Sequence, residues 1–521
     1  MEQARSIFQS NPVSEKQSHS PFGESFDIPT DLAQESTRLQ QAFGVDRPIV
    51  AVQGLGFVGA AMSAALMQSK DASGSLRYNV IGVDLLHADH YWKIARSNIG
   101  LPPVSSADAS IDDIYAMAQN QGNFTATYSE TAYTMADIII VDVNVDVHRE
   151  APGDINKYEV SLDGLKAAIQ TLARHMKPDA LVLVETTLPP GTTEKIIAPI
   201  LRDELKGRKL YAGDFNLAYS FERVMPGESY LNSIIAFHRA FAGINPSSSL
   251  KTRDFLESFI DTQKFPLHEL GSTTACEMAK VLENSYRATN IAFIEEWSGF
   301  AQKAGVDLFE IVNSIRVRPT HSNIMAPGFG VGGYCLTKDA LLGEWGLKTL
   351  FNTPDNLEFS RSAISVNDRM PAAVMDIIRN IYTDLTDIQM AILGISYRPD
   401  VADTRNTPAD HFNNLCLAAG MQVSYHDPLL SYWSERDLPI SNDLGDLYDK
   451  SIELLVFALP SQDYRKLTGE TIVAKFPELK VVIDANNVLT DSTAESLHQA
   501  GIQVAGIGKG HWNRFWRKAD V

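Results

Sequence analysis

The first half of the chain contains short apolar runs separated by longer stretches in which apolar residues recur at helical spacing. The runs cover residues 49–52, 78–84, 136–143, 180–187 and 215–220, and one of the helical stretches surrounds 162–175. A short apolar run bounded by turn residues is typical of a strand buried in a parallel sheet. The alternation of strands and helices therefore predicts a doubly wound α/β domain over residues 47–250.

The second half repeats this pattern on a smaller scale. Apolar runs at 390–396, 421–427, 453–459 and 480–486 alternate with helical stretches and predict a second α/β domain over residues 386–510. Residues 274–305 contain no proline and predict one long helix within a central helical region at 251–385. A helix of that length suits a connector or a dimer-forming element, although a core helix broken near Ser298-Gly299 is an alternative. The expected fold class is thus α/β, with two Rossmann-like doubly wound domains joined by a central helical region.

Both ends of the chain depart from this pattern. Residues 1–46 are polar and rich in Ser, Gln, Pro and Glu, which predicts a mobile polar tail with a short helix near 30–43. Residues 511–521 are basic and aromatic, and we interpret them as a solvated tail.

The overall charge and the cysteine content exclude several classes of function. The formal net charge is −19, which argues against a nucleic-acid binder because such proteins need a basic surface. No apolar stretch approaches the roughly 18 residues of a membrane span, and the first residues lack a hydrophobic signal core, so a cytoplasmic protein is expected. The cysteines Cys276, Cys335 and Cys416 are too few and too scattered for a disulfide framework, and no Cys/His spacing predicts a metal site.

Three glycines mark a candidate dinucleotide site. Gly54, Gly56 and Gly59 follow a strand and open a helix, which is the arrangement that lets a pyrophosphate approach the backbone at a helix N-terminus. Asp84 closes the next strand and is placed to accept hydrogen bonds from a ribose diol, which favours NAD over NADP. The interval before Asp84 is long, and a polar surface insertion at 70–77 accounts for it. A glycine turn with a purely structural role is the alternative.

The segment Pro327–Asp339, PGFGVGGYCLTKD, is the most unusual in the chain. Four glycines precede Cys335, and a loop so rich in glycine can wrap closely around a ligand. Cys335 is predicted to open a helix, where a thiol has a lowered pKa and more thiolate, with Asp339 one turn further on. A small buried apolar residue is the alternative interpretation of this cysteine.

The predicted long helix carries a second candidate pair. Lys280 and Asn284 lie at positions i and i+4, so their side chains share one face of the helix. Such a pair could donate hydrogen bonds to a carbonyl or an alkoxide, and a solvated helix face is the alternative.

Seven blocks between about residues 48 and 490 resemble the UDP-glucose/GDP-mannose dehydrogenase family, the nucleotide-sugar 6-dehydrogenases. The blocks stand in the family order and read VAVQGLGFVG, VETTLPPGTT, SFERVMPG, AKVLENSYRATNIAFIEE, PGFGVGGYCLTKD, LGISYRPDVADTRNTPA and SYHDP. The resemblance implies an NAD-binding domain, a central region with a long dimer helix, and a second α/β domain that binds the nucleotide of the substrate. It also implies a homodimer or a higher homo-oligomer.

The activity implied by the resemblance is a four-electron oxidation of a sugar C6 alcohol to a uronate with NAD as cofactor. Cys335 would form a thiohemiacetal and then a thioester, and Lys280 and Asn284 would donate to the oxyanion. Thr187 and Glu222 would position a water that assists proton loss, and Asp339 would assist hydrolysis of the thioester.

The resemblance also assigns binding residues. Those for the cofactor are Gly54, Gly56, Phe57, Val58, Gly59, Asp84, Thr187 and Arg405. Those for the substrate are Glu222, Arg223, Lys280, Asn284, Gly332 and Arg398. For Arg398 and Arg405, an ordinary surface charge is the alternative.

The chain departs from the family pattern at four places. Val143–Asp146 replaces a Val-Pro-Thr-Pro-like turn, Phe221 replaces a proline before Glu222, Tyr334 replaces a His or Ser, and Asp484–Asn487 reads Asp-Ala-Asn-Asn instead of Asp-x-Arg-Asn. The segment 222–227 resembles the branch that acts on UDP-N-acetyl-hexosamines, so a UDP-sugar of that kind or UDP-glucose is the expected substrate. The alternatives are a GDP-mannose 6-dehydrogenase, a two-electron hydroxyacid dehydrogenase and a catalytically degenerate nucleotide-sugar sensor.

Overall fold

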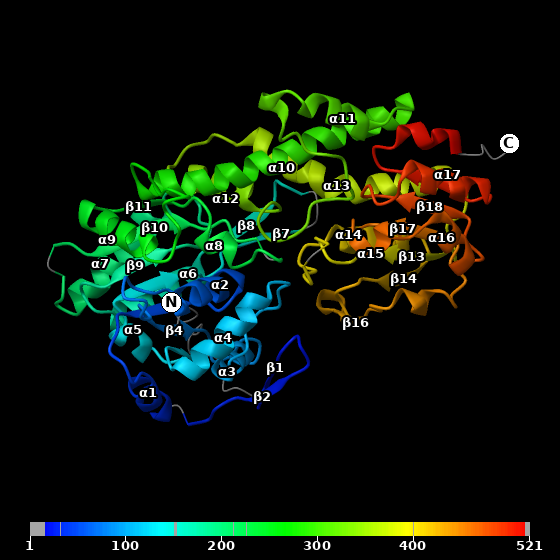
Figure 1. Ribbon diagram of the computed structural model, residues 1–521. Helices are drawn as coiled ribbons and strands as arrows, with labels where there is room; N and C mark the ends of the chain where they lie inside the picture. The colour runs from blue at the N-terminus through cyan, green and yellow to red at the C-terminus, as the bar shows by residue number, and fades with distance from the viewer. Residues whose placement is uncertain are drawn as a thin grey trace. The chain divides into compact units, whose positions relative to one another are not determined.

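The computed structural model describes residues 16–31, 33–150, 154–211, 213–225, 227–399 and 401–515 (Figure 1). The chain divides into two compact units. The first consists of the described residues within Met1–His148, Val160–Val281 and Leu342–Asn356, and the second of those within Arg149–Glu159, Leu282–Leu341 and Leu357–Val521.

The first unit is built around an eight-stranded sheet in the order β12-β11-β10-β9-β6-β3-β4-β5. Its strands are β3 (Ile49–Gln53), β4 (Asn79–Val83), β5 (Phe124–Thr127), β6 (Ile138–Val141), β9 (Leu181–Val184), β10 (Asn216–Phe221), β11 (Ala240–Gly243) and β12 (His268–Glu269). From β5 to β10 the neighbours are parallel, and β11 runs antiparallel to β10. The order reverses between β3 and β6, which is the doubly wound dinucleotide-binding topology.

The helices of this unit connect the strands. They are α2 (Phe57–Met67), α3 (Tyr91–Asn98), α4 (Ala109–Gln121), α5 (Thr131–Met135), α6 (Asp163–His175), α7 (Ala198–Gly207), α8 (Asn232–Ile235) and α9 (Pro246–Glu257), with a π-helical turn η1 (Thr193–Ile197) before α7. Helix α2 is buried from Gly59 to Met67, because it has apolar or small residues all round and lies within the core beside β3 and β4.

The second unit contains a five-stranded parallel sheet in the order β14-β13-β17-β18-β19. Its strands are β13 (Gln389–Leu393), β14 (Gln422–His426), β17 (Leu454–Phe457), β18 (Val481–Asp484) and β19 (Gln503–Gly506), and its helices include α14 (Pro408–Ala418), α15 (Gln462–Arg465), α16 (Gly469–Lys475) and α17 (Asp491–Gln499). Two short strands, β15 (Tyr432–Trp433) and β16 (Leu438–Pro439), form a small antiparallel pair. The expected fold class is confirmed, because both sheets are doubly wound.

The two sheets share one local hydrogen-bonding arrangement. In the first, the carboxylate of Asp84 after β4 accepts the N–H of Leu55 after β3 at 3.1 Å. In the second, the carboxylate of Asp427 after β14 accepts the N–H groups of Ile395 and Ser396 after β13, each at 2.8 Å. An acid at the end of one strand thus fixes the turn that leaves its neighbour.

The predicted long helix is confirmed as α10 (Thr273–Ala304), which runs unbroken through Ser298-Gly299. It is followed by α11 (Leu308–Arg316), α12 (Asp339–Trp345), the π-helical turn η3 (Gly346–Leu350) and α13 (Glu358–Ile381). Among the described residues, no helix combines the length and the apolar character that a membrane crossing requires.

The described part of the expected N-terminal tail differs from a mobile tail. Residues 1–15 lie outside the described residues, but strands β1 (Gln17–His19) and β2 (Ser25–Asp27) pair, and α1 (Ala33–Gln40) follows. Leu39 is fully buried, and Arg38 donates to Thr125 and Ala126 on β5. This segment is therefore packed on the first unit. Its polar composition did not indicate that the buried side chain of Leu39 anchors α1.

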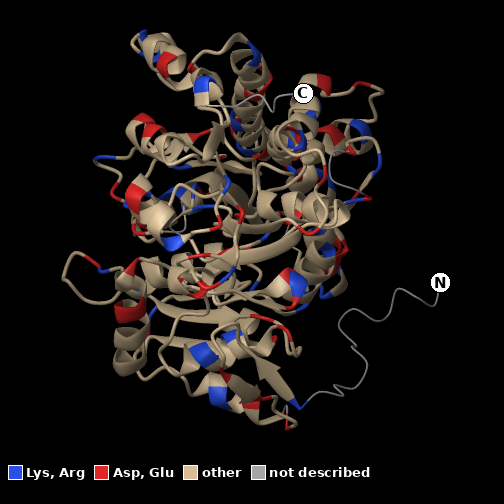
Figure 2. Ribbon diagram, turned by 90° about the vertical axis from the view of Figure 1, so that its right-hand side faces the viewer, with Lys and Arg blue, Asp and Glu red and all other residues tan. Residues whose placement is uncertain are grey.

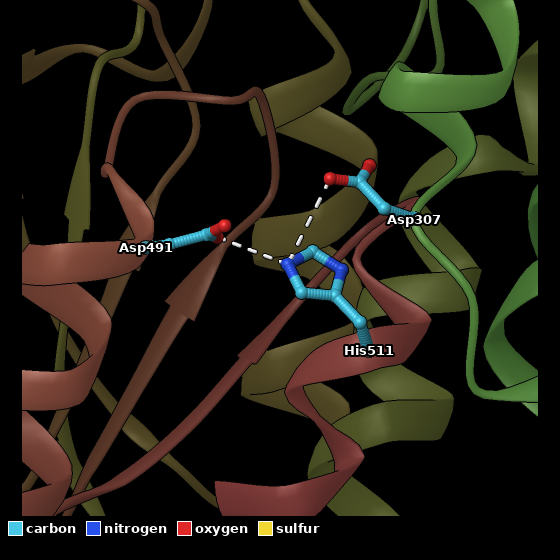
Figure 3. A group of neighbouring side chains, drawn as sticks. All are labelled: Asp307, Asp491 and His511. Atoms are coloured by element: carbon cyan, nitrogen blue, oxygen red, sulfur yellow. Dashed lines mark hydrogen bonds and ion pairs between the residues drawn. The ribbon is translucent and has the colours of Figure 1, made fainter.

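The expectation of a solvated C-terminal tail is wrong for residues 511–515; residues 516–521 lie outside the described residues. The segment forms the 3-10 helix η6 (Gly510–Phe515), in which Trp512 is fully buried. Figure 3 shows His511 pointing between two carboxylates, and its Nε2 lies 2.9 Å from Asp491 and 3.7 Å from Asp307. Trp512 also donates to Asp491 at 2.7 Å. The rings of His511 and Trp512 therefore anchor this segment to the acids at the starts of α17 and α11.

The candidate active site

The glycine turn after β3 has the shape that a pyrophosphate requires. Gly54 has φ +103°, and a Cβ there would lie 2.6 Å from the carbonyl oxygen of Asp142. A Cβ on Gly59 would lie 1.8 Å from the carbonyl oxygen of Gly54, so this glycine is also obligatory. Gly56 caps α2 and is exposed, with open space where its Cβ would be. The backbone is therefore accessible at the N-terminus of α2, where N–H groups favour anions.

Asp84 stands beside this turn as an ionised acid. Burial would raise its pKa, but His90 and Lys93, with Nδ1 and Nζ at 3.3 Å and 3.2 Å from its oxygens, lower the pKa to about 2. The predicted neighbours Phe57 and Val58 lie half-buried in the first turn of α2. The glycines, the helix N-terminus and Asp84 therefore fit a dinucleotide, and this part of the sequence prediction is brought together in one place.

Four ionisable side chains lie at one edge of the same sheet. Asp142 follows β6, Glu185 follows β9, Glu222 follows β10, and Arg239 precedes the antiparallel β11. Because carboxyl ends of neighbouring parallel strands meet at one edge, the fold collects these groups. Arg239 pairs with Glu185 at 3.0 Å in complete burial, and the pKa of Glu185 is raised to about 7 by burial, against the opposing charge of Arg239.

Lys280 reaches the same edge from α10. Its Nζ donates to the carbonyl oxygen of Glu222 at 2.8 Å and lies 3.4 Å from that residue's carboxylate. Both side chains are about nine-tenths buried, at 8% and 10% exposure. Arg223 donates to the carbonyl oxygen of His238 at 2.6 Å, and Thr187 lies half-buried three residues after β9. Thus the structure brings together Lys280 and Glu222, two of the predicted catalytic residues.

Sequence reasoning missed Glu277, which shapes the loop after β9. Its carboxylate accepts the N–H groups of Gly191 and Thr193 at 2.6 Å and 2.8 Å and the hydroxyl of Thr193 at 2.7 Å. Burial raises the pKa of Glu277 to about 7, in spite of these hydrogen bonds. Glu277 lies one turn before Lys280 on α10 and shares a face with it. This helical spacing is the sequence feature that could have identified Glu277.

Cys335 is exposed, whereas Cys276 and Cys416 are buried. Its prediction as the first residue of a helix is corrected, because α12 begins at Asp339 and Cys335 lies in the preceding turn. The N–H of Asp339 donates to the carbonyl oxygen of Cys335 at 3.0 Å, so the predicted one-turn separation is confirmed. Asp339 is buried and accepts hydrogen bonds from Asn284 at 2.6 Å and Lys338 at 3.3 Å. The cysteine turn is thereby fixed to α10 through Asn284.

Internal packing accounts for two of the glycines before Cys335. A Cβ on Gly332 would lie 2.5 Å from Tyr397 and 2.9 Å from the carbonyl oxygen of Asn406, and one on Gly333, with φ +81°, would lie 2.9 Å from Tyr397. The loop needs glycine because it packs against the protein's own 397–408 segment.

Arg405 lies in the same neighbourhood of the second unit. It pairs with Asp403 at 2.7 Å, and its guanidinium carbon lies 5.8 Å from the ring centre of Tyr334, next to Cys335. Its carbonyl oxygen accepts the N–H of Gly333 at 3.0 Å. Arg398 is half-buried, belongs to the same segment and forms an isolated antiparallel β-bridge with Val401. A cavity of about 210 Å³ is lined by Val331 and Thr337 of the cysteine loop together with residues of this segment and of α13 and α14.

The histidine cluster of Figure 3 is the one group of His, Cys, Asp or Glu ligand atoms within metal-binding reach among the described residues. Asp307 caps α11 by accepting the N–H of Phe309 at 2.8 Å, and Asp491 accepts from Trp512. These contacts connect η6 to the starts of α11 and α17, so the cluster has a structural role within the second unit. Figure 2 shows acidic and basic positions interspersed along the described elements.

Three family models match successive parts of the chain. Residues 49–254 match the NAD binding domain of the UDP-glucose/GDP-mannose dehydrogenase family, 274–369 its central domain and 391–491 its UDP binding domain. A UDP-N-acetyl-D-mannosamine dehydrogenase from Pyrococcus horikoshii is 27% identical over 465 residues, covering 88% of this chain and 99% of the relative.

Two solved structures are similar over nearly the whole chain. A UDP-D-ManNAc dehydrogenase from Pyrococcus horikoshii has a TM-score of 0.74 at 26% identity, covering 89% of this chain and 100% of the other. An NDP-N-acetyl-D-galactosaminuronic acid dehydrogenase from Methanosarcina mazei has a TM-score of 0.73 at 25% identity, covering 92% and 99%. With the family models matching most of its length, the chain belongs to the UDP-glucose/GDP-mannose dehydrogenase family and is an NAD-dependent oxidoreductase.

Proposed function

We propose that this protein oxidises the C6 alcohol of a UDP-N-acetyl-hexosamine to the carboxylate through a covalent intermediate on Cys335. The observation that carries the proposal is the placement of that cysteine. It is the exposed member of the three cysteines, and its turn is fixed by the hydrogen bond between Asn284 and the buried Asp339. A side chain kept accessible on an anchored turn suits a nucleophile better than a packing residue.

The chemistry assigned to Cys335 explains why a dehydrogenase needs a thiol. Bound NAD⁺ supplies the hydride acceptor for each of the two oxidations. The thiolate adds to the aldehyde carbon to give a thiohemiacetal, whose oxidation leaves a thioester. Water then cleaves the C–S bond, which releases the carboxylate and restores the thiol. The balance is one alcohol, two NAD⁺ and one water giving one carboxylate, two NADH and three protons.

Lys280 and Asn284 are proposed as donors to the oxyanion that forms on the sugar carbon. The buried ion pair with Glu222 orients the ammonium of Lys280, which suits an electrostatic role. Glu222 and Thr187 are proposed to hold the water that takes the first proton from the alcohol. Asp339, buried and paired, is proposed to orient Asn284 and to assist hydrolysis.

The binding residues are proposed in two groups. Gly54, Gly56, Gly59 and Asp84 would hold the cofactor, as their geometry supports, and the family resemblance proposes Arg405 as a further cofactor residue. Arg223, Gly332 and Arg398 would contact the sugar or its diphosphate. The similarity to a UDP-N-acetyl-D-mannosamine dehydrogenase and to an NDP-N-acetyl-D-galactosaminuronic acid dehydrogenase favours an N-acetylated sugar over glucose.

We also propose a homodimer formed through α10. Six large apolar side chains are exposed on one face of this helix: Met278, Leu282, Tyr286, Phe293, Trp297 and Phe300. Their exposed fractions range from 48% to 64%, and the largest exposed apolar patches on soluble proteins commonly mark interfaces.

A panel of UDP- and GDP-sugars tests the substrate. NADH formation with UDP-N-acetyl-mannosamine or its galactosamine and glucosamine epimers is expected, with weaker activity on UDP-glucose. NADH formation with GDP-mannose alone would contradict the assignment, and no NADH with any sugar would favour a nucleotide-sugar sensor. Cys335→Ser should yield no carboxylate, whereas Cys416→Ala, which changes a buried cysteine, should retain it.

A further inference from the structure

Asp142 is a buried acid for which the proposed reaction has no use. It follows β6, and both of its carboxylate oxygens are buried without a hydrogen-bond partner. Both cations at this edge have other partners, because Arg239 donates to Glu185 and Lys280 pairs with Glu222. An unpaired buried carboxyl is costly, so it points to a partner that arrives with a ligand.

The backbone of Asp142 adjoins the cofactor turn. Its N–H donates to the carbonyl oxygen of Gln53 at 2.8 Å, and its own carbonyl oxygen is the atom that excludes a Cβ at Gly54. In doubly wound sheets the dinucleotide lies across the point where the strand order reverses, here between β3 and β6. Asp84 marks the adenosine side at the end of β4, so β6 and β9 lie on the nicotinamide side.

We propose that Asp142 makes the site prefer the oxidised form of NAD over the reduced form, because its carboxyl lies on the nicotinamide side and its negative charge attracts the cationic ring. The ring of NAD⁺ carries a positive charge and that of NADH does not. A single charge acting on the ring at an effective dielectric constant of about 20 is worth on the order of a tenfold difference in affinity. This inference rests on the NAD-binding domain and is independent of the sugar.

Binding should then release a proton. Burial, with the neighbouring charges of Glu185 and Glu222, raises the pKa of Asp142 well above its usual value, and Arg239 opposes this only in part. The free protein therefore binds the proton on Asp142 more tightly than an ordinary aspartate does. The arriving cation favours the carboxylate, so the O–H bond breaks and the proton leaves to solvent without any transfer of electrons.

Titration calorimetry in two buffers of different ionisation enthalpy tests this without any sugar. Wild-type protein should release a large fraction of one proton per NAD⁺ bound at about pH 7, and none on binding NADH. Its affinity for NAD⁺ should rise several-fold per pH unit, up to about tenfold, whereas the affinity for NADH stays level. In Asp142→Asn the release should vanish, and the ratio of NAD⁺ to NADH affinity should fall about tenfold at about pH 8.

Two variants serve as controls. Asp137→Asn changes an acid at the opposite end of the same strand, where it pairs with Lys177, and should behave as wild type. Glu185→Gln should still release a proton, with the release shifted to lower pH. Release that persists in Asp142→Asn but vanishes in Glu185→Gln would assign the effect to Glu185 and overturn the proposal. If Asp142→Asn does not fold, an absence of release in the wild type alone overturns it. Because no sugar is present, either outcome leaves the proposed oxidation untouched.

Discussion

At the scale of single residues, the contrast among the three cysteines predicts selective alkylation. Cys335 is exposed, whereas burial raises the pKa of Cys276 and of Cys416 to about 12. Since the thiolate is the reactive form, iodoacetamide at neutral pH should modify Cys335 at least tenfold faster than the other two. Peptide mass spectrometry over a time course measures this, and equal rates at all three cysteines would contradict it.

A buried acid on α10 predicts a pH-dependent stability. Burial raises the pKa of Glu295 to about 8, and one of its carboxylate oxygens has no hydrogen-bond partner. The folded state binds the proton more tightly than the unfolded state, so this group costs stability as pH rises from about 4.5 to 8. Glu295→Gln should therefore stabilise the protein by on the order of 2 kcal/mol at about pH 8, with little effect at about pH 5. Urea unfolding at the two pH values tests this, and an equal effect at both would refute the role of burial.

The residues that sequence reasoning found are those with a local signature. Gly54 and Gly59 have a fixed spacing, and Lys280 and Asn284 have helical periodicity, so chain position alone marks them. Asp142, Arg239 and Glu277 have no such mark, because their importance arises where separate strands and α10 bring them together. The internal packing of the cysteine-loop glycines could not be predicted, since their close neighbour Tyr397 is more than sixty positions away.

At the scale of elements, the exposed apolar face of α10 predicts self-association. The double variant Trp297→Asp/Phe300→Asp places two charges on this face and should convert a dimer into a monomer in sedimentation velocity. Arg287→Glu is the matched control, because Arg287 is exposed on another side of the same helix. A wild-type monomer, or a double variant that remains dimeric, would exclude α10 as the interface.

The cluster of Asp307, Asp491 and His511 gives a second prediction at this scale. Burial tends to raise the pKa of Asp491, but hydrogen bonds from His511 and Trp512 lower it overall. A lowered acid pKa contributes stability above the unfolded value, which is lost as pH falls through the folded one. Asp491→Asn should cost about 1 kcal/mol near pH 7 and almost nothing near pH 3. Asp463→Asn, a change of an exposed acid in the same unit, is the control for this unfolding measurement.

The elements themselves were largely predictable. Buried parallel strands produce continuous apolar runs, and each of the predicted runs contains a strand. The short helix expected near 30–43 is present as α1, whereas η6 escaped prediction. The packing of both segments depends on single buried residues, Leu39 and Trp512, whose partners are distant in sequence. Composition cannot reveal an anchor of that kind.

At the scale of the whole molecule, the chain joins a dinucleotide-binding unit to a second unit that carries the exposed cysteine. The first unit carries the glycine turn with its acids, and the second carries the thiol on its anchored turn. The proposed covalent capture of the aldehyde would assign the thiol of the second unit a role that a simple alcohol dehydrogenase does not need.

The stoichiometry of the reaction tests this account most directly. A limiting amount of UDP-N-acetyl-mannosamine, or of the best sugar in the panel, is converted to completion with excess NAD⁺. NADH is measured by absorbance and the product by mass spectrometry. The account predicts two NADH per sugar and a carboxylate product without free aldehyde. One NADH per sugar with an aldehyde product would contradict it.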